Sequence, residues 1–168
     1  DKQLRNLPVL GFAGDNFHQP AQVLGEWVEY KGSVMAIDPS GRGSDETSYA
    51  VVNILNGFLW VLECSGVEGG YGEKTMQTLT DIAKKYKVKQ ILVESNFGDG
   101  MFTELLKPYL RKTYPVTTEE VRHNIQKEKR IIDTLEPIMN QHKLIVSPKM
   151  IDDDFTSTKH LPPEKAPQ

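Results

Sequence analysis

The clearest structural signal in the chain is residues 33–38, Ser-Val-Met-Ala-Ile-Asp, an apolar run that ends in an acidic residue. A short apolar run predicts a buried β-strand, and Pro39 to Ser44 has the composition of the loop that would follow it. A second run of the same kind, Gln90 to Glu94, also ends in an acid. Two buried strands, each closing on a carboxylate, are therefore predicted at the centre of the fold.

The segment between these two strands predicts a β-hairpin. Tyr49 to Leu55 and Phe58 to Glu63 are rich in β-branched and aromatic residues, and they flank Asn56-Gly57. This dipeptide favours a type I′ turn, because both central positions of that turn need a positive φ. Together with residues 33–38, the hairpin predicts an antiparallel meander of three strands.

Three helices are predicted from apolar residues that recur at spacings of three and four. They cover Glu73 to Tyr86, Gly100 to Lys112 and Gln126 to His142, with a kink expected at Pro108 and an interruption at Pro137. The residues expected to face inward are Met76, Leu79, Ala83, Tyr86, Phe102, Leu105, Leu106, Tyr109, Leu110, Ile131, Ile132, Leu135, Ile138 and Met139.

The order of these elements predicts an α/β fold. A last short strand is expected at Leu144 to Val146, and the sequence leaves room for a small one near Val121. Strands that alternate with helices pair in parallel through right-handed crossovers. A three-strand antiparallel meander followed by parallel strands is the layout of the RNase H-like fold, so we expect a mixed five-stranded sheet with helices on both faces.

The chain divides by composition into a central domain and two flanking segments. Residues 32–151 are expected to form the RNase H-like domain, residues 1–31 an arm or linker, and residues 152–168 a polar, Pro-rich tail. The missing initial Met and this tail suggest a piece of a longer polypeptide. The single cysteine, Cys64, excludes an internal disulfide and a cysteine zinc cluster, and its strand context predicts a small core residue.

Charge and motif content exclude several protein classes. The net charge is −3, whereas a chain built only to coat nucleic acid is usually basic. No run approaches the roughly 18 apolar residues that a membrane helix needs. The phosphate-binding motif Gly-x-x-x-x-Gly-Lys-Ser/Thr does not occur, which excludes a P-loop motor within this chain.

The acids Asp38 and Glu94 are the main candidates for chemistry. If their strands are parallel neighbours, both side chains emerge at the carboxyl edge of the sheet, where open α/β sheets bind ligands. Asp38 before Pro39 is also ordinary turn chemistry, and Glu94 could simply lead into the next helix. The pair is more specific than either residue, because adjacent carboxylates repel unless a cation lies between them. We therefore expect Mg²⁺ or Mn²⁺ here, with two ions in the complete site.

Further charged residues are also candidates for the site. Asp45 either reaches the same metals or caps its loop. Arg42, in the loop after Asp38, is a candidate contact for DNA phosphates. Lys127, Lys129 and Arg130 are either phosphate contacts or a solvated helix face.

Three segments resemble a known family. Residues 36–47 (Ala-Ile-Asp-Pro-Ser-Gly-Arg-Gly-Ser-Asp-Glu-Thr), 93–102 (Val-Glu-Ser-Asn-Phe-Gly-Asp-Gly-Met-Phe) and 133–137 (Asp-Thr-Leu-Glu-Pro) resemble the C-terminal nuclease domain of the large terminase subunit of podoviruses. The resemblance covers about residues 32–150 and implies an endonuclease that cuts concatemeric double-stranded DNA during packaging. It places the first two metal-binding acids of that family on Asp38 and Glu94.

The resemblance also implies a setting for the domain. An ATPase motor domain would precede it, and its partners would be double-stranded DNA, the portal protein and the small terminase subunit, in the host cytoplasm at the procapsid portal. The third acid of the family lies in an Asp-Asp-Arg-x-Asp-Ala segment that does not occur here, and Asp152-Asp153-Asp154 does not match it. Weak or absent cleavage by this chain alone is therefore expected.

Two other functions are compatible with the sequence. Without its third acid the domain could serve as a docking module for DNA or for the portal. The actin and sugar-kinase ATPases share the fold and carry an Asp and glycines in their first hairpin, as Asp38-Pro-Ser-Gly41 does here. Those proteins need a duplicated domain, for which this chain is too short.

Overall fold

A computed structural model describes residues 26–40, 46–95, 100–123 and 126–162 of the chain. The strands are β1 (Gly32–Asp38), β2 (Thr47–Leu55), β3 (Phe58–Val67), β4 (Gln90–Glu94), β5 (Thr117–Val121) and β6 (Leu144–Val146). The helices are α1 (Glu73–Lys85), α2 (Met101–Thr113), α3 (Lys127–Asn140) and α4 (Pro148–Thr158). The described residues divide into two compact units, and residues 30–145 form the larger one.

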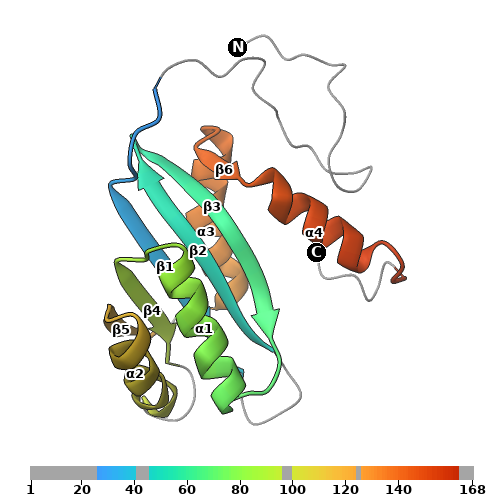
Figure 1. Cartoon of the computed structure of the whole chain (residues 1–168). Coiled ribbons are helices and arrows are strands. Elements are labelled where there is room, and N and C mark those ends of the chain that lie inside the picture. Colours follow the sequence, from blue (N-terminus) through green and yellow to red (C-terminus); the bar gives the residue numbers. More distant parts are fainter. Residues whose placement is uncertain (1–25, 41–45, 96–99, 124–125, 163–168) are drawn as a thin grey trace. The chain divides into compact units, whose positions relative to one another are not determined.

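The strands form one mixed sheet in the order β5-β4-β1-β2-β3-β6 (Figure 1). β1, β2 and β3 make the predicted antiparallel meander, and β4 pairs in parallel with β1 on one side and with β5 on the other. The RNase H-like arrangement is confirmed, with six strands in the described residues rather than the expected five. The additional strand is β5, which the sequence indicated only weakly, near Val121.

The hairpin between β2 and β3 forms where the sequence predicts it. Asn56 and Gly57 have φ angles of 52° and 79°, which are the two positive values that a type I′ turn requires. β3 continues past Glu63 to Val67, and its pairing with β2 is irregular between Val51 and Val52.

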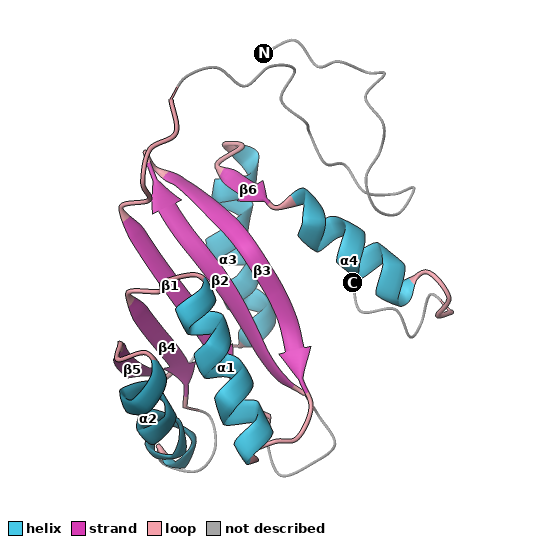
Figure 2. Ribbon diagram, viewed as in Figure 1, coloured by secondary structure: helices cyan, strands magenta, loops and turns pink. Residues whose placement is uncertain are grey.

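One face of the sheet carries the hydrophobic core, which α1 and α2 cover (Figure 2). Met35 and Ile37 of β1 and Ile91 of β4 point into this core. The helices contribute buried side chains that include Met76 and Leu106. Strand alternation and the helical apolar faces therefore agree on a single core.

Helix α3 packs differently. None of its residues is buried, and Ile131, Ile132 and Met139 are exposed, which corrects the expectation that they face inward. The periodic apolar residues show that the helix has an apolar face, but they do not show that another element covers it. Leu105 of α2 was likewise expected to face inward from its spacing, but it is exposed.

Cys64 is exposed, so the expectation of a core residue is wrong. Successive side chains of a strand point to opposite faces. Glu63 points toward the C-terminal end of α1, where it contacts Lys85 and the next residue, Tyr86, so Cys64 points away from the core.

The C-terminal part of the chain contains a helix that the sequence reading missed. α4 begins with Pro148, a residue favoured in the first helical turn, and ends at Thr158. Lys149 forms an ion pair with Asp153 one turn along it. The helix therefore continues across the predicted boundary at residue 152, into the segment described as a polar, Pro-rich tail, as far as Thr158. No helix within the described ranges is long and apolar enough to cross a membrane.

Candidate metal centre

The register of the parallel strands brings Asp38 and Glu94 together. β1 and β4 pair in register from Val34 with Gln90 to Ile37 with Val93. Asp38 and Glu94 are the next residues on the two strands, so they leave the sheet side by side at its carboxyl edge. The sequence prediction that these two acids share one edge of the sheet agrees with this pairing.

Strand alternation assigns both acids to the face opposite the hydrophobic core. Ile37 and Val93 are buried among the core residues, so the residues that follow them point the other way. Ala36, which shares the face of Asp38, is exposed. The acids therefore emerge on the thinly covered side of the sheet, toward α3.

The first turn of α3 supplies a cation to each acid. Lys127 Nζ donates to Asp38 Oδ2 at 2.6 Å, and Arg130 Nη2 donates to Glu94 Oε1 at 3.0 Å. Residues three apart on a helix lie on the same face, which is why one turn reaches both carboxylates. The result is a cluster of two acids and two bases.

The four charges interact as one group. The hydrogen bond to Asp38, followed by the charge of that carboxylate, raises the pKa of Lys127 above its ordinary value. Glu94 raises this pKa further, whereas Arg130 lowers it. Arg130 and Glu94 are the more enclosed pair, with 21% and 16% of their side chains exposed. Arg130 Nη1 is buried and meets no acceptor within the part of the chain that is described.

The loop that follows Asp38 is closed at its base by two buried residues. The backbone N–H of Ser40 donates to Thr47 Oγ1 at 3.1 Å, and the two hydroxyl groups are also 3.1 Å apart. These bonds fix the exit of β1 and the start of β2 beside the acids. Arg42 and Asp45, both predicted site residues, lie in this loop outside the described residues.

The sequence predicted the two acids but not the basic residues that pair with them. Lys127 and Arg130 were expected on a solvated helix face or on DNA phosphates, and their ion pairs with Asp38 and Glu94 were missed. Their spacing of three residues at the start of a helix was the available signal. Lys129 lies on the exposed part of the same turn.

The donor chemistry of the acid pair fits a hard divalent cation. Mg²⁺ is usually held by one or two carboxylates and retains several waters, and carboxylates also suit Mn²⁺. Asp38 and Glu94 provide two such groups. Within residues 26–40, 46–95, 100–123 and 126–162, no group of three or more acids, histidines or cysteines could complete a larger metal site.

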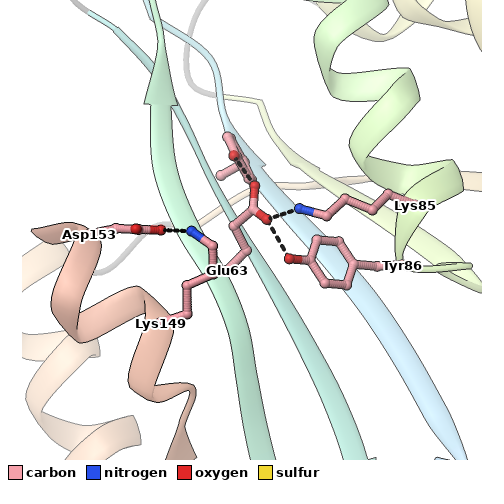
Figure 3. A network of polar contacts seen from close by, with 6 residues as sticks. Glu63, Lys85, Tyr86, Lys149 and Asp153 are labelled. Carbon is pink, nitrogen blue, oxygen red and sulfur yellow. Dashed lines mark hydrogen bonds and ion pairs between the residues drawn. The ribbon is translucent and has the colours of Figure 1, made fainter.

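A third partly buried acid, Glu63 of β3, has a different environment (Figure 3). Its carboxylate accepts hydrogen bonds from Tyr49 at 2.6 Å, from Lys85 at 2.7 Å and from Tyr86. Burial alone would raise the pKa of Glu63, but these hydrogen bonds outweigh it and lower the pKa. Burial, and then the bond to Glu63, raise the pKa of Tyr49. With its oxygens satisfied by protein donors, Glu63 joins α1 to the sheet.

Comparison with protein families gives a match over the region that contains both acids. Residues 37–144 match the family model described as Terminase Bacteriophage T7, Ribonuclease H-like domain. The large terminase subunit of Enterobacteria phage T3 is 40% identical over 161 residues. This alignment covers 95% of the chain but 28% of that relative, so the chain spans less than a third of the relative's length.

Solved structures with a similar fold include viral terminases at low sequence identity. The large terminase of a thermophilic bacteriophage has a TM-score of 0.54 at 14% identity, over 80% of this chain and 34% of that one. The large terminase nuclease of the thermophilic phage G20c has a TM-score of 0.52 at 15% identity, over 74% and 63%. A manganese-soaked, inhibitor-bound nuclease domain of human cytomegalovirus terminase has a TM-score of 0.52 at 9% identity, over 72% and 64%.

Proposed function

Because this chain belongs to the Ribonuclease H-like domain family of T7-type bacteriophage terminases, we propose that it is a metal-dependent DNA endonuclease domain. The observation that carries the proposal is the adjacent placement of Asp38 and Glu94 at the carboxyl edge of parallel strands. The family match establishes the fold, and the placement of the acid pair supports the proposed reactive centre.

In this proposal Asp38 and Glu94 hold Mg²⁺ or Mn²⁺, with two ions in the complete site. Such ions activate the attacking water and stabilise the leaving oxygen of a phosphodiester. The manganese soak of the cytomegalovirus nuclease domain agrees with this choice of metal. Asp45 remains a candidate for a further metal ligand.

The basic residues around the acids would bind and orient the DNA. Arg130 is a candidate because its guanidinium lies beside the acid pair, on Glu94, and a guanidinium binds phosphate oxygens through strong charged hydrogen bonds. Lys129 is exposed on the same turn, and Arg42 lies in the loop after Asp38. Phosphate contacts of this kind position the duplex without reading its sequence.

The role in the whole protein is also a proposal. We expect the domain to cut concatemeric double-stranded DNA in the host cytoplasm, at the portal of the procapsid. An ATPase motor domain N-terminal to this chain, the portal protein and the small terminase subunit would be its partners. The similarity to the T3 large terminase supports this setting.

Cleavage and metal binding test the proposal together. Supercoiled plasmid should be nicked or linearised in the presence of Mg²⁺ or Mn²⁺, and Asp38→Asn and Glu94→Gln should each abolish this. Glu63→Gln is the matched control, because it removes a carboxylate from the same sheet at a site saturated by protein donors.

A second measurement tests the metal site even if this chain cleaves DNA only weakly. Binding of Mn²⁺, followed by the loss of the electron paramagnetic resonance signal of the free ion, should require Asp38 and Glu94 but not Glu63. Mn²⁺ binding and cleavage that survive both acid replacements would refute the assignment. DNA binding without cleavage, in a longer chain that includes every acid of the family, would favour the docking function instead.

A further inference from the structure

The two cations of the acid cluster differ in how firmly they are held. The side chain of Lys127 is 59% exposed, whereas that of Arg130 is 21% exposed. A lysine ammonium is compact, strongly hydrated and carried on a flexible stem, so water readily takes the place of its partner. Arg130 and Glu94 are both largely enclosed, and separating such a pair leaves charges that water cannot easily reach.

Among the described residues, the charges of the acid cluster already balance. Asp38 and Glu94 together carry two negative charges, and Lys127 and Arg130 offset them. A divalent ion placed among all four groups would be repelled by two neighbouring positive charges. Occupation of the site by metal therefore requires that at least one of the two bases moves away.

The packing of α3 permits such a movement at its N-terminus. No residue of α3 is buried, and Gln126 makes no side-chain capping bond at its start. A long lysine side chain in the first turn can also leave Asp38 by rotation about its own bonds, without movement of the helix.

Building on the proposed metal site, we propose that Lys127 is an exchangeable counter-ion. It occupies Asp38 in the metal-free protein, keeps the two acids from repelling each other, and is displaced when a divalent cation binds. Arg130 stays on Glu94 and acts as a positioning residue. The cation therefore enters on the Asp38 side of the cluster by exchange with the Lys127 ammonium.

Titration with Mn²⁺ at low ionic strength tests the exchange directly, with the free ion measured by electron paramagnetic resonance. Lys127→Met removes the competing charge and keeps the length of the side chain. We expect it to bind Mn²⁺ about fivefold more tightly than the unchanged chain, the upper range for loss of one partly exposed ion pair. Lys127→Arg retains a competing cation and should bind no more tightly than the unchanged chain.

Lys129→Met is the matched control. It removes the same charge from the same helical turn, at an exposed position. If long-range charge alone governed the affinity, Lys129→Met and Lys127→Met would tighten binding equally, and the exchange would be disproved. We expect Lys129→Met to remain within about twofold of the unchanged chain, because screening weakens exposed charges.

The outcomes separate this inference from the proposed function. If Asp38→Asn abolishes Mn²⁺ binding while Lys127→Met fails to tighten it, the metal site stands and the exchange is wrong. If Asp38→Asn binds Mn²⁺ as well as the unchanged chain, the metal site itself is wrong. Absence of Mn²⁺ binding in both the unchanged chain and Lys127→Met would overturn both ideas.

Discussion

The two faces of the sheet differ in the interactions that their side chains make. On the face covered by α1 and α2, apolar side chains are buried, and the partly buried acid Glu63 accepts bonds from two tyrosines and a lysine. On the face toward α3, two acids stand at the strand ends opposite two cations, and apolar residues of the helix remain exposed.

This difference indicates that one face mainly stabilises the fold and that the other carries the candidate site. Burial of apolar surface is the main stabilising contribution to a fold, so the α1 and α2 face should carry most of the unfolding free energy. The exposed ion pair between Lys127 and Asp38 contributes little to stability, but the adjacent carboxylates create a place where another cation can bind. The site could therefore change its charge state with little effect on the core.

The largest expected effect compares one residue type on the two faces. Met76 of α1 is 1% exposed and Met139 of α3 is 56% exposed. Met76→Ala should lower the unfolding free energy by about 3 kcal/mol, because it leaves a cavity in the core. Met139→Ala should lower it by less than about 0.5 kcal/mol. Urea denaturation measures both, and equal losses would show that α3 is as firmly packed as α1.

The next effect concerns the enclosed ion pair. Arg130→Met removes the cation from a largely buried carboxylate, and we expect a loss of about 2 kcal/mol, less than for a fully buried pair. Lys129→Met, one position earlier and exposed, should change the unfolding free energy by less than about 0.5 kcal/mol. Thermal and urea denaturation in metal-free buffer distinguish the two. Equal small losses would mean that Arg130 does not hold Glu94 in place.

A smaller loss of stability is expected for Glu63, the acid on the core face whose carboxylate accepts three hydrogen bonds from protein donors. Glu63→Gln should lower the unfolding free energy by about 1–2 kcal/mol at neutral pH, because charged hydrogen bonds are lost. The pKa of Glu63 is lowered from 4.5 in the folded protein, so its contribution is present above that pH and disappears as the pH falls through the folded value.

Measuring the unfolding free energy at acidic pH tests the direction of this effect. The difference between the unchanged chain and Glu63→Gln should be greatest near neutrality and should shrink below about pH 4. A difference that instead grew toward low pH would show that the network does not stabilise the charged carboxylate.

Much of the fold was accessible from sequence because local patterns determined it. Asn56-Gly57 located the hairpin, and the apolar runs ending at Asp38 and Glu94 located the strands that bring the acids together. In each of these cases backbone geometry and strand periodicity act over a few residues. The shared sheet edge of the acid pair follows from the parallel pairing of β1 with β4, which the order of the elements favoured, whereas the register that sets the two acids side by side comes from the structure.

What the sequence did not reveal depends on tertiary neighbours. The apolar repeat of α3 looks like that of a buried helix, yet Ile132 and Met139 are exposed because no described element covers them. The pairing of Lys127 with Asp38 joins residues 89 positions apart, and no local pattern records it. The saturation of Glu63 likewise needs two strands and the end of α1 together.

The smallest expected effect sharpens the contrast between the two cations of the site. Lys127→Met should change the unfolding free energy by less than about 0.5 kcal/mol, because exposed ion pairs contribute little and salt screens them. Raising the salt concentration should remove what remains of that difference, while most of the loss in Arg130→Met persists. Urea denaturation at low and high salt gives both values. A Lys127→Met loss as large and as salt-resistant as that of Arg130→Met would mean that both bases are fixed parts of the fold, and that neither is poised to leave.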